Sequence, residues 1–79
     1  MNLEIINPSA VVYTGGDVTL VQFPGIEGSF EVMENHAPMI SVLKKGKIKV
    51  IVKNEKPLWF DVNGGVVEVL QNKVLVLAE

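Results

Sequence analysis

The chain has 79 residues, with seven lysines, no arginine, nine acidic residues, no cysteine and a net charge of -2. A domain of this size buries only about 60–65% of the surface of its unfolded chain and usually needs a disulfide, a metal or a partner. Without cysteine, disulfides and thiolate metal sites are excluded, which also fits a reducing compartment. A partner surface is therefore the expected source of additional stability.

The distribution of charge argues against nucleic-acid binding. The isoelectric point is about 5.3, and without arginine the bidentate contacts to phosphate or guanine cannot form. Residues 1–43 hold five acids and no base, whereas residues 44–56 hold six of the seven lysines. This lysine cluster indicates either a solvated sheet face with protected edges or an electrostatic partner surface.

The amino-terminal stretch MNLEIINPSAVVY carries no positive charge and reaches Asn7-Pro8 before any long apolar run. We therefore do not expect a signal peptide there. No segment approaches the roughly 20 apolar residues that cross a bilayer. A membrane role is expected only through a larger assembly.

Short runs of β-branched and aromatic residues, separated by glycine, proline and asparagine, predict an all-β domain. In chain order, the expected strands are LEIINP, AVVYT, DVTLVQF, GSFEVM, MISVLKK, GKIKVIVKN, LWFDVN, VVEVL and VLVLAE. Turns are expected at Gly15-Gly16, Pro24-Gly25, Asn54-Glu55, Gly64-Gly65 and residues 71–73. Eight to ten short strands at about eight-residue spacing predict a sandwich or barrel, in a single domain covering residues 1–79.

The clearest alternation lies in GKIKVIVKN. Ile48, Val50 and Val52 share one face of this strand, while Lys47, Lys49, Ile51 and Lys53 share the other. Period-two alternation predicts one buried face and one solvated face. The strand should therefore cover the core with its valines and isoleucine and present lysines outward.

The only histidine, His36, lies near three acids, Glu27, Glu31 and Glu34. A metal site needs further ligands, and the chain has no second histidine and no cysteine. A hydrolytic triad needs a nucleophile oriented with its base, and no nucleophile-elbow pattern surrounds the nearby hydroxyls. The turn-forming sequence Asn-His-Ala-Pro favours a structural or interface role for the imidazole. No catalytic, cofactor-binding or metal-binding residue is predicted.

Two further features have simple alternatives. The glycine pairs open no helix and precede no Gly-Lys-Ser/Thr, so they indicate turns or bulges and not phosphate loops. Lys73 lies in a predicted hairpin turn, which is where lipoyl and biotinyl carrier domains present their modified lysine. The usual Asp-Lys-Ala or Met-Lys-Met flanks are absent, so the carrier function is kept as the alternative hypothesis.

The segment PGIEGSFEVMENHAPMISVLKKGKIKV resembles the G-x-x-G…P-N-H-A-P-L…G-x-[IV] segment of the epsilon subunits of F-type ATP synthases. The ending FDVNGGVVEVLQNKVLVLAE is similar to that family's F-x-V-x-G-G…E-V…V-L-A-[ED] ending, and LEIINPSAVVYTGG to its opening strand and turn. Two departures are Glu31 and the Met33-Glu34 pair, which replace the commoner Gly and Leu-Pro. Typical members continue into two antiparallel helices, and because this chain stops at Glu79, the regulatory roles of those helices are not carried over.

The resemblance implies a flattened antiparallel β-sandwich of about ten short strands, without an active site of its own. It implies a proton-translocating ATP synthase, in which the chain would bind the gamma subunit, rest on the c-subunit ring and couple rotation to ATP synthesis. It would lie at the cytoplasmic side of the cell's inner (plasma) membrane as part of the F1 sector. The residues matching the family's c-ring loop are Glu27, Gly28 and Ser29. The residues matching its gamma-facing region are Asn7, His36, Ala37, Pro38 and Ser41.

Overall fold

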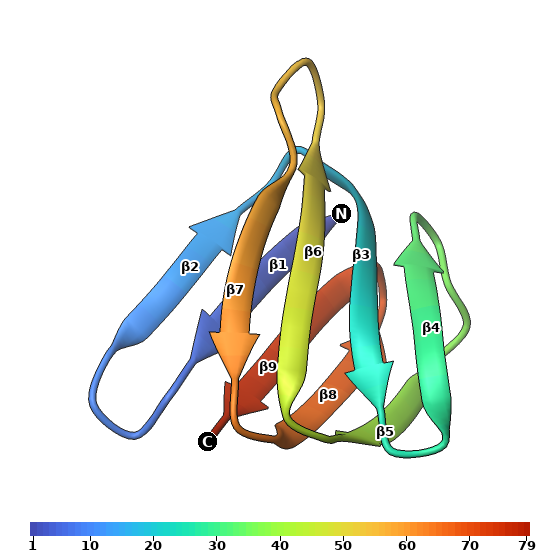
Figure 1. Ribbon diagram of the computed structural model, residues 1–79. Helices are drawn as coiled ribbons and strands as arrows, with labels where there is room; N and C mark the ends of the chain where they lie inside the picture. The colour runs from blue at the N-terminus through green and yellow to red at the C-terminus, as the bar shows by residue number, and fades with distance from the viewer.

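The computed structural model describes residues 1–79 and contains nine β-strands and no helix (Figure 1). The predicted all-β class is therefore confirmed, with nine strands where about ten were expected. The strands are β1 (Asn2–Ile6), β2 (Val11–Gly15), β3 (Val18–Gly25), β4 (Gly28–Met33), β5 (Met39–Leu43), β6 (Gly46–Val52), β7 (Leu58–Val62), β8 (Gly65–Leu70) and β9 (Lys73–Ala78).

Hydrogen bonds join all nine strands into one sheet, which folds over on itself. The order is β2-β1-β9-β8-β5-β3-β6-β7, with β4 paired to β3. The two layers join where β3 meets β5, and there only Gly25 and Leu43 pair. One layer contains β2, β1, β9, β8 and β5, and the other contains β4, β3, β6 and β7 (Figure 1). The result is the expected sandwich.

The pairing of β1 with β9 differs from the antiparallel arrangement that was expected. These two strands run parallel, with Leu3 opposite Val74 and Ile5 opposite Val76, while all other pairs are antiparallel. A parallel neighbour needs a long connection, and here almost the whole chain separates the two strands. Such a long-range pair leaves no local signal in the sequence.

Tight turns connect the hairpins of the sandwich. Gln71 and Asn72 have φ values of 50° and 60°, so both central residues of the β8–β9 turn take the positive φ of the type I′ geometry that matches strand twist. The β3–β4 hairpin turns over Ile26 and Glu27, between the paired residues Gly25 and Gly28. These turns place the residues between the strands at the ends of the sandwich.

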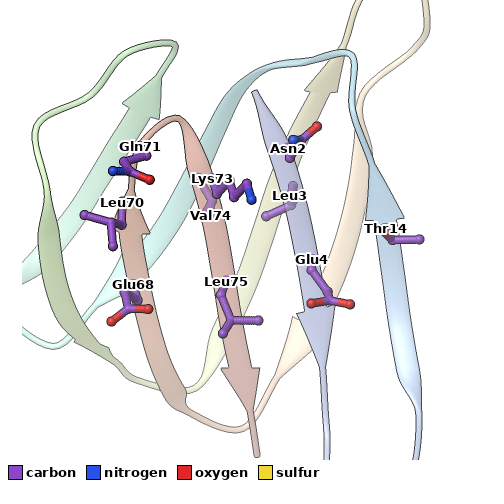
Figure 2. A pocket seen from close by; sticks show the side chains of 10 residues that line it. All are labelled: Asn2, Leu3, Glu4, Thr14, Glu68, Leu70, Gln71, Lys73, Val74 and Leu75. Atoms are coloured by element: carbon purple, nitrogen blue, oxygen red, sulfur yellow. The ribbon is translucent and has the colours of Figure 1, made fainter.

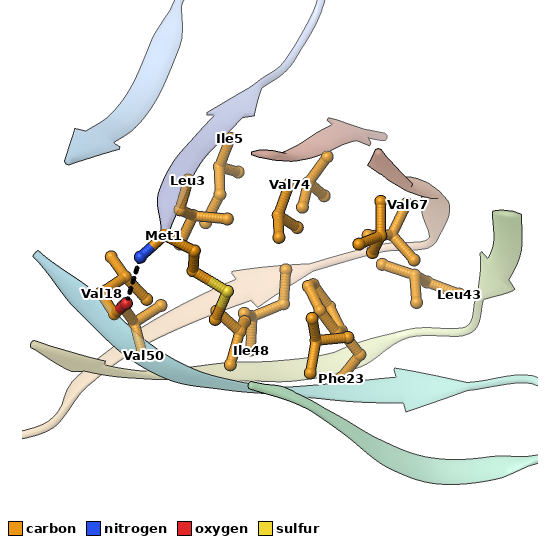
Figure 3. Close-up of a cluster of buried hydrophobic side chains, with 14 of the residues drawn as sticks. Met1, Leu3, Ile5, Val18, Phe23, Leu43, Ile48, Val50, Val67 and Val74 are labelled. Carbon is orange, nitrogen blue, oxygen red and sulfur yellow. Dashed lines mark hydrogen bonds between the residues drawn. The ribbon is translucent and has the colours of Figure 1, made fainter. Parts of the chain in front are cut away.

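The core lies between the two layers and contains 17 buried apolar residues (Figure 3). Ile48, Val50 and Val52 of β6 belong to it, as their alternation predicted. Phe23 is fully buried and its ring lies 5.3 Å from that of Phe30 on β4. Burial of such apolar side chains is the main favourable term that holds the layers together.

The strand ends show where the predicted limits were wrong. β3 continues through Pro24 to Gly25, although the proline was expected to end it. Proline is tolerated there because it is the second-last residue of the strand, where few ladder hydrogen bonds are needed. β5 ends at Leu43 and not at Lys45, since Lys44 N–H donates to the Pro24 carbonyl at the fold between the layers.

Candidate docking surface

The outer face of the β1-β9-β8-β5 layer is apolar, and we call it the apolar face. Strand alternation points every second residue of these strands away from the core, and their burial patterns follow this alternation. Its most exposed apolar residues are Ile40 (69% exposed), Leu70 (50%), Leu77 (49%), Val42 (48%) and Val66 (37%). Clusters of exposed apolar residues on a sheet face are typical of surfaces that another protein covers.

These residues are neighbours across the strands. Val42 pairs with Val66, and Val66 pairs with Leu77, so the three side chains form one continuous row. The next row runs from Ile40 through Glu68 to Leu75 and then to Glu4. The apolar face therefore has an entirely apolar row of side chains at one end. The row next to it alternates apolar side chains with two carboxylates.

The carboxylates line a shallow hollow of about 490 Å³ on this face. Figure 2 shows Glu68 and Glu4 on either side of Leu75, with the Lys73 side chain directed toward β1. None of these three charged groups forms an ion pair within the chain. A partner with basic groups above Glu4 and Glu68 would meet two carboxylates that have no ion-pair partner within the chain.

Asn7 lies at one corner of the apolar face. Its Oδ1 accepts hydrogen bonds from the backbone N–H groups of Ser9 (2.8 Å) and Ala10 (2.9 Å), which closes the β1–β2 turn. Together with Ile6, Pro8 and residues 77–78 it lines a hollow of about 230 Å³. Since the amide oxygen is engaged inside the turn, Asn7 shapes this corner, and the neighbouring apolar side chains form its surface.

The His36 segment lies at the opposite end of the same face. Pro38 lines a hollow of about 380 Å³ with Met39, Ile40 and residues 68–70. His36 is half-buried, and its Nδ1 donates to the Ala37 carbonyl at 2.7 Å. The imidazole thus supports the loop that leads into Ile40, while the interface role expected for it stays a prediction.

A contact that the sequence did not reveal holds this loop in place. Asn35 has a φ of 61°, and its backbone N–H donates to Oδ1 of Asn72 at 2.8 Å. Asn72 belongs to the β8–β9 turn, so one side chain connects the two loops at this end of the sandwich. Asparagine in a turn was visible in the sequence, but its distant partner was not.

The three c-ring candidates gather at the β3–β4 turn. Glu27 is at the exposed tip, Gly28 has a φ of 127°, and the Ser29 hydroxyl accepts from Gln22 Nε2 at 3.2 Å. Ser41, which was assigned to the gamma side, lies with these residues along one groove of about 420 Å³. Its side chain points to the same face of β5 as the buried Leu43, while Ile40 and Val42 point to the apolar face.

The acidic side chains near His36 in the sequence do not cluster around it in the structure. Glu34 Oε1 lies 3.0 Å from the amino group of Met1, which also donates to the Val18 carbonyl (Figure 3). Glu27 is at the far tip of the β3–β4 hairpin, and Glu31 lies on the outer face of β4 opposite Gln22. No group of three or more histidine and acidic residues is arranged to hold a metal. The three acids that lie near His36 in the sequence are therefore dispersed in the structure.

Sequence reasoning missed most of the apolar face. A signal for it existed, because VVEVL and VLVLAE are nearly continuous apolar runs with apolar residues at successive positions. Continuous runs are typical of strands that are covered on both faces. Applied to β8 and β9, this rule would have predicted a partner over Val66 and Leu77.

Comparison with known proteins identifies the fold family. The delta/epsilon chain β-sandwich domain of ATP synthase matches residues 1–79, which is the whole chain. The chain belongs to this family. The ATP synthase epsilon chain of Chlorobium limicola is 36% identical over 98% of this chain and 86% of its own length. That of Staphylococcus haemolyticus is 39% identical over the whole chain, which spans 59% of its relative.

Solved structures share the same sandwich. A chain in the central stalk and c-ring of Tetrahymena thermophila mitochondrial ATP synthase superposes with a TM-score of 0.82 at 19% identity, covering 98% of this chain and 61% of that one. A chain of the Euglena gracilis mitochondrial enzyme gives a TM-score of 0.90 at 18% identity, covering 96% of this chain and 48% of that one. At such identities the likeness shows the delta/epsilon fold alone.

Family membership does not support the carrier alternative. In the structure Lys73 is the first residue of β9 and pairs with Leu70, so the tip of the hairpin is formed by Gln71 and Asn72. A carrier lysine needs to stand at the tip, where a modifying enzyme reaches it.

The structure also contains no helix long and apolar enough to span a membrane.

Proposed function

We propose that this delta/epsilon-family chain is a non-catalytic subunit of the central stalk of a proton-translocating ATP synthase. It binds the gamma subunit through the apolar face and rests on the c-subunit ring through the β3–β4 turn. Held between the two, it turns with both and couples rotation to ATP synthesis. The complex holds it at the membrane, on the cytoplasmic side of the inner (plasma) membrane.

The apolar face carries this proposal. Exposed Val42, Val66 and Leu77 lie side by side in a domain whose small core leaves stability marginal. Covering them with a second protein removes apolar surface from water, which stabilises the assembly in the way that packing stabilises a core. Pro38 and Asn7, which the family resemblance assigns to gamma, lie at the two ends of this surface.

The end that would meet the c ring has mixed charge. Glu27 stands at the tip of the β3–β4 turn, and Lys44 bonds through its backbone to Pro24 beside that turn. Lys45 follows at once and is also exposed. The contact with the ring is therefore expected to use both the negative charge of Glu27 and the positive charges of Lys44 and Lys45. It should not depend on an acidic loop alone.

The fold suits a part that transmits force. Residues 1–79 form a close-packed sandwich in which the buried side chains of both layers interdigitate, and such interiors yield little under load. The junction of β3 and β5, the Asn35–Asn72 contact and the β1–β9 pair connect distant segments of the chain. Stiffness, and not reactivity, is what coupling two rotating bodies requires.

A pull-down from membrane extract tests this function. The tagged chain is expected to capture gamma, and Leu77→Glu is expected to abolish the capture because it places a charge in the apolar row that Leu77 forms with Val42 and Val66. Trp59→Glu is the matched control, since Trp59 is 56% exposed on the other layer and Leu77 is 49% exposed. Circular dichroism verifies that both variants are folded.

Two results would contradict the proposal. The first is failure of the folded wild-type chain to capture gamma. The second is equal loss of gamma in both variants, because that would make the contact independent of the apolar face. Turnover by the isolated chain would in addition contradict its non-catalytic nature.

A further inference from the structure

The layer opposite the apolar face carries most of the positive charge of the chain. Six lysines lie on and beside β6, and we call them the lysine stripe: Lys44, Lys45, Lys47, Lys49, Lys53 and Lys56. Lys44 and Lys45 precede the strand, and Lys53 and Lys56 follow it, so the charges extend along its whole length. The stripe is thus one elongated basic surface on an acidic protein.

The lysines of the stripe are largely free of partners. Lys47 is the only lysine in an ion pair, with its Nζ 2.7 Å from Oδ1 of Asp61. The other acids near the stripe are Glu27 at the β3–β4 turn beside Lys44, Glu31 on β4, Glu55 in the β6–β7 loop and Asp17, whose carbonyl accepts from the Lys53 N–H. The lysines outnumber these acids, so the face keeps a positive potential.

An exposed tryptophan stands within the stripe. Trp59 on β7 is 56% exposed and pairs across the strands with Lys49, whose Nζ lies 5.4 Å from the centre of the indole ring. Beside this pair, Ile51 and Leu20 on the same face are only partly buried. An amphipathic indole next to lysines is the combination that settles at the headgroup level of a bilayer.

We propose that the lysine stripe and Trp59 bind the surface of a bilayer that contains anionic lipid. Lysine offers a point charge on a flexible stem, which suits a diffuse anionic surface, whereas specific recognition of single phosphates and carboxylates favours arginine. The surface is a sheet face without a deep pocket, and no hollow is lined by the stripe lysines. Lipid headgroups would thus be bound by the extended surface and its positive charge, and not by a pocket that fits one headgroup.

The proposed function would bring the lysine stripe close to a membrane. The lower end of the stripe, Lys44 and Lys45, lies beside the β3–β4 turn that would rest on the c ring, and a bilayer surrounds that ring. This placement alone rests on the proposed function, since binding to lipid requires neither gamma nor the ring. The two proposals can therefore fail independently.

The test uses the 79-residue chain and vesicles of phosphatidylcholine, either pure or with 30% phosphatidylglycerol. Trp59 is the only tryptophan, so its emission reports directly on the contact. We expect co-sedimentation and a blue shift with the anionic vesicles alone, both reversed by high salt because the charges are screened. Each lysine near such a surface contributes about a fivefold factor in partitioning.

The charge-reversal variants give the matched comparison. Lys49→Glu/Lys53→Glu is expected to reduce partitioning at least about twenty-five-fold. Lys73→Glu reverses the one lysine outside the stripe, on the apolar face, and should weaken binding much less. Folding is verified by circular dichroism, and Lys49→Gln provides a milder change in case the double variant does not fold.

Three outcomes would overturn the lipid contact. They are equal binding to both kinds of vesicle, an equal loss with Lys73→Glu, and no binding to anionic vesicles at low salt. If vesicles do not bind but Lys49→Glu/Lys53→Glu weakens assembly with the other stalk subunits, the stripe faces an acidic protein surface instead.

Discussion

Replacing Ile40 by alanine tests the apolar face at its most exposed residue. Full burial of an isoleucine side chain is worth about 1.5–3 kcal/mol, or about 0.8 kcal/mol for each carbon removed. With 69% of Ile40 still exposed in the isolated chain, most of this gain remains to be made against a partner. Removing three carbons should therefore weaken binding to gamma by about 1.5 kcal/mol, which is roughly tenfold in Kd.

The matched control makes the same substitution on the opposite layer. Ile51 lies on the outer face of β6, so Ile51→Ala removes the same atoms from a surface that gamma is not expected to touch. Its affinity for gamma should stay within about twofold, although thermal unfolding should show a small loss because the side chain is half-buried. Ile40→Ala should change the unfolding temperature less than Ile51→Ala does.

Titration of labelled gamma with each purified variant measures both affinities. The reasoning is refuted if Ile40→Ala binds gamma as tightly as the wild-type chain. It is refuted equally if both variants lose affinity to the same extent, because the two faces would then be indistinguishable to gamma.

Four other changes have definite expectations. Gly65→Ala should lower the free energy of unfolding in urea by more than about 3 kcal/mol, since φ is +147° and the new Cβ would clash with the Leu77 carbonyl oxygen of the neighbouring strand β9. Gly28→Ala has a φ of +127° but open space around the new Cβ, so a loss of about 1–3 kcal/mol is expected, and equal urea midpoints would contradict the distinction. Asn72→Ala removes the acceptor of the exposed Asn35 N–H and should lower the unfolding temperature by an amount equivalent to about 0.5–1.5 kcal/mol, whereas an unchanged temperature would show that the contact is dispensable. Glu27→Lys should lower ATP-driven proton pumping in reconstituted vesicles, and unchanged pumping with normal assembly would argue against a role for this carboxylate at the ring.

Local patterns in the sequence predicted the strands well. The alternation of Ile48, Val50 and Val52 reflects one-sided burial, and residue type alone reveals it. The Gln71-Asn72 turn was also predicted, because polar residues between two apolar runs favour a hairpin. Strand ends at Pro24 and Lys45 were less accurate, since contacts between the layers decide where pairing stops.

The arrangement of the strands in space was not accessible in the same way. The parallel pair β1–β9 and the contact between Asn35 and Asn72 join residues that are far apart in the chain, and composition carries no record of them. The resemblance to ATP synthase epsilon subunits supplied the partners and the loop residues. It did not reveal the apolar face, because the matched motifs do not show which of their apolar residues stay exposed on the outer face of the sheet.

The measurement that tests the account most directly is cysteine protection, which is possible because the chain has no cysteine of its own. Ile40→Cys, Trp59→Cys and Glu27→Cys are treated with a maleimide alone, with gamma, and in the assembled complex with its ring. We predict that gamma alone protects position 40, that the ring is needed to protect position 27, and that position 59 stays reactive with gamma. Full labelling at position 40 in the presence of saturating gamma, or protection at position 59 instead, would contradict a chain held between gamma and the ring through these surfaces.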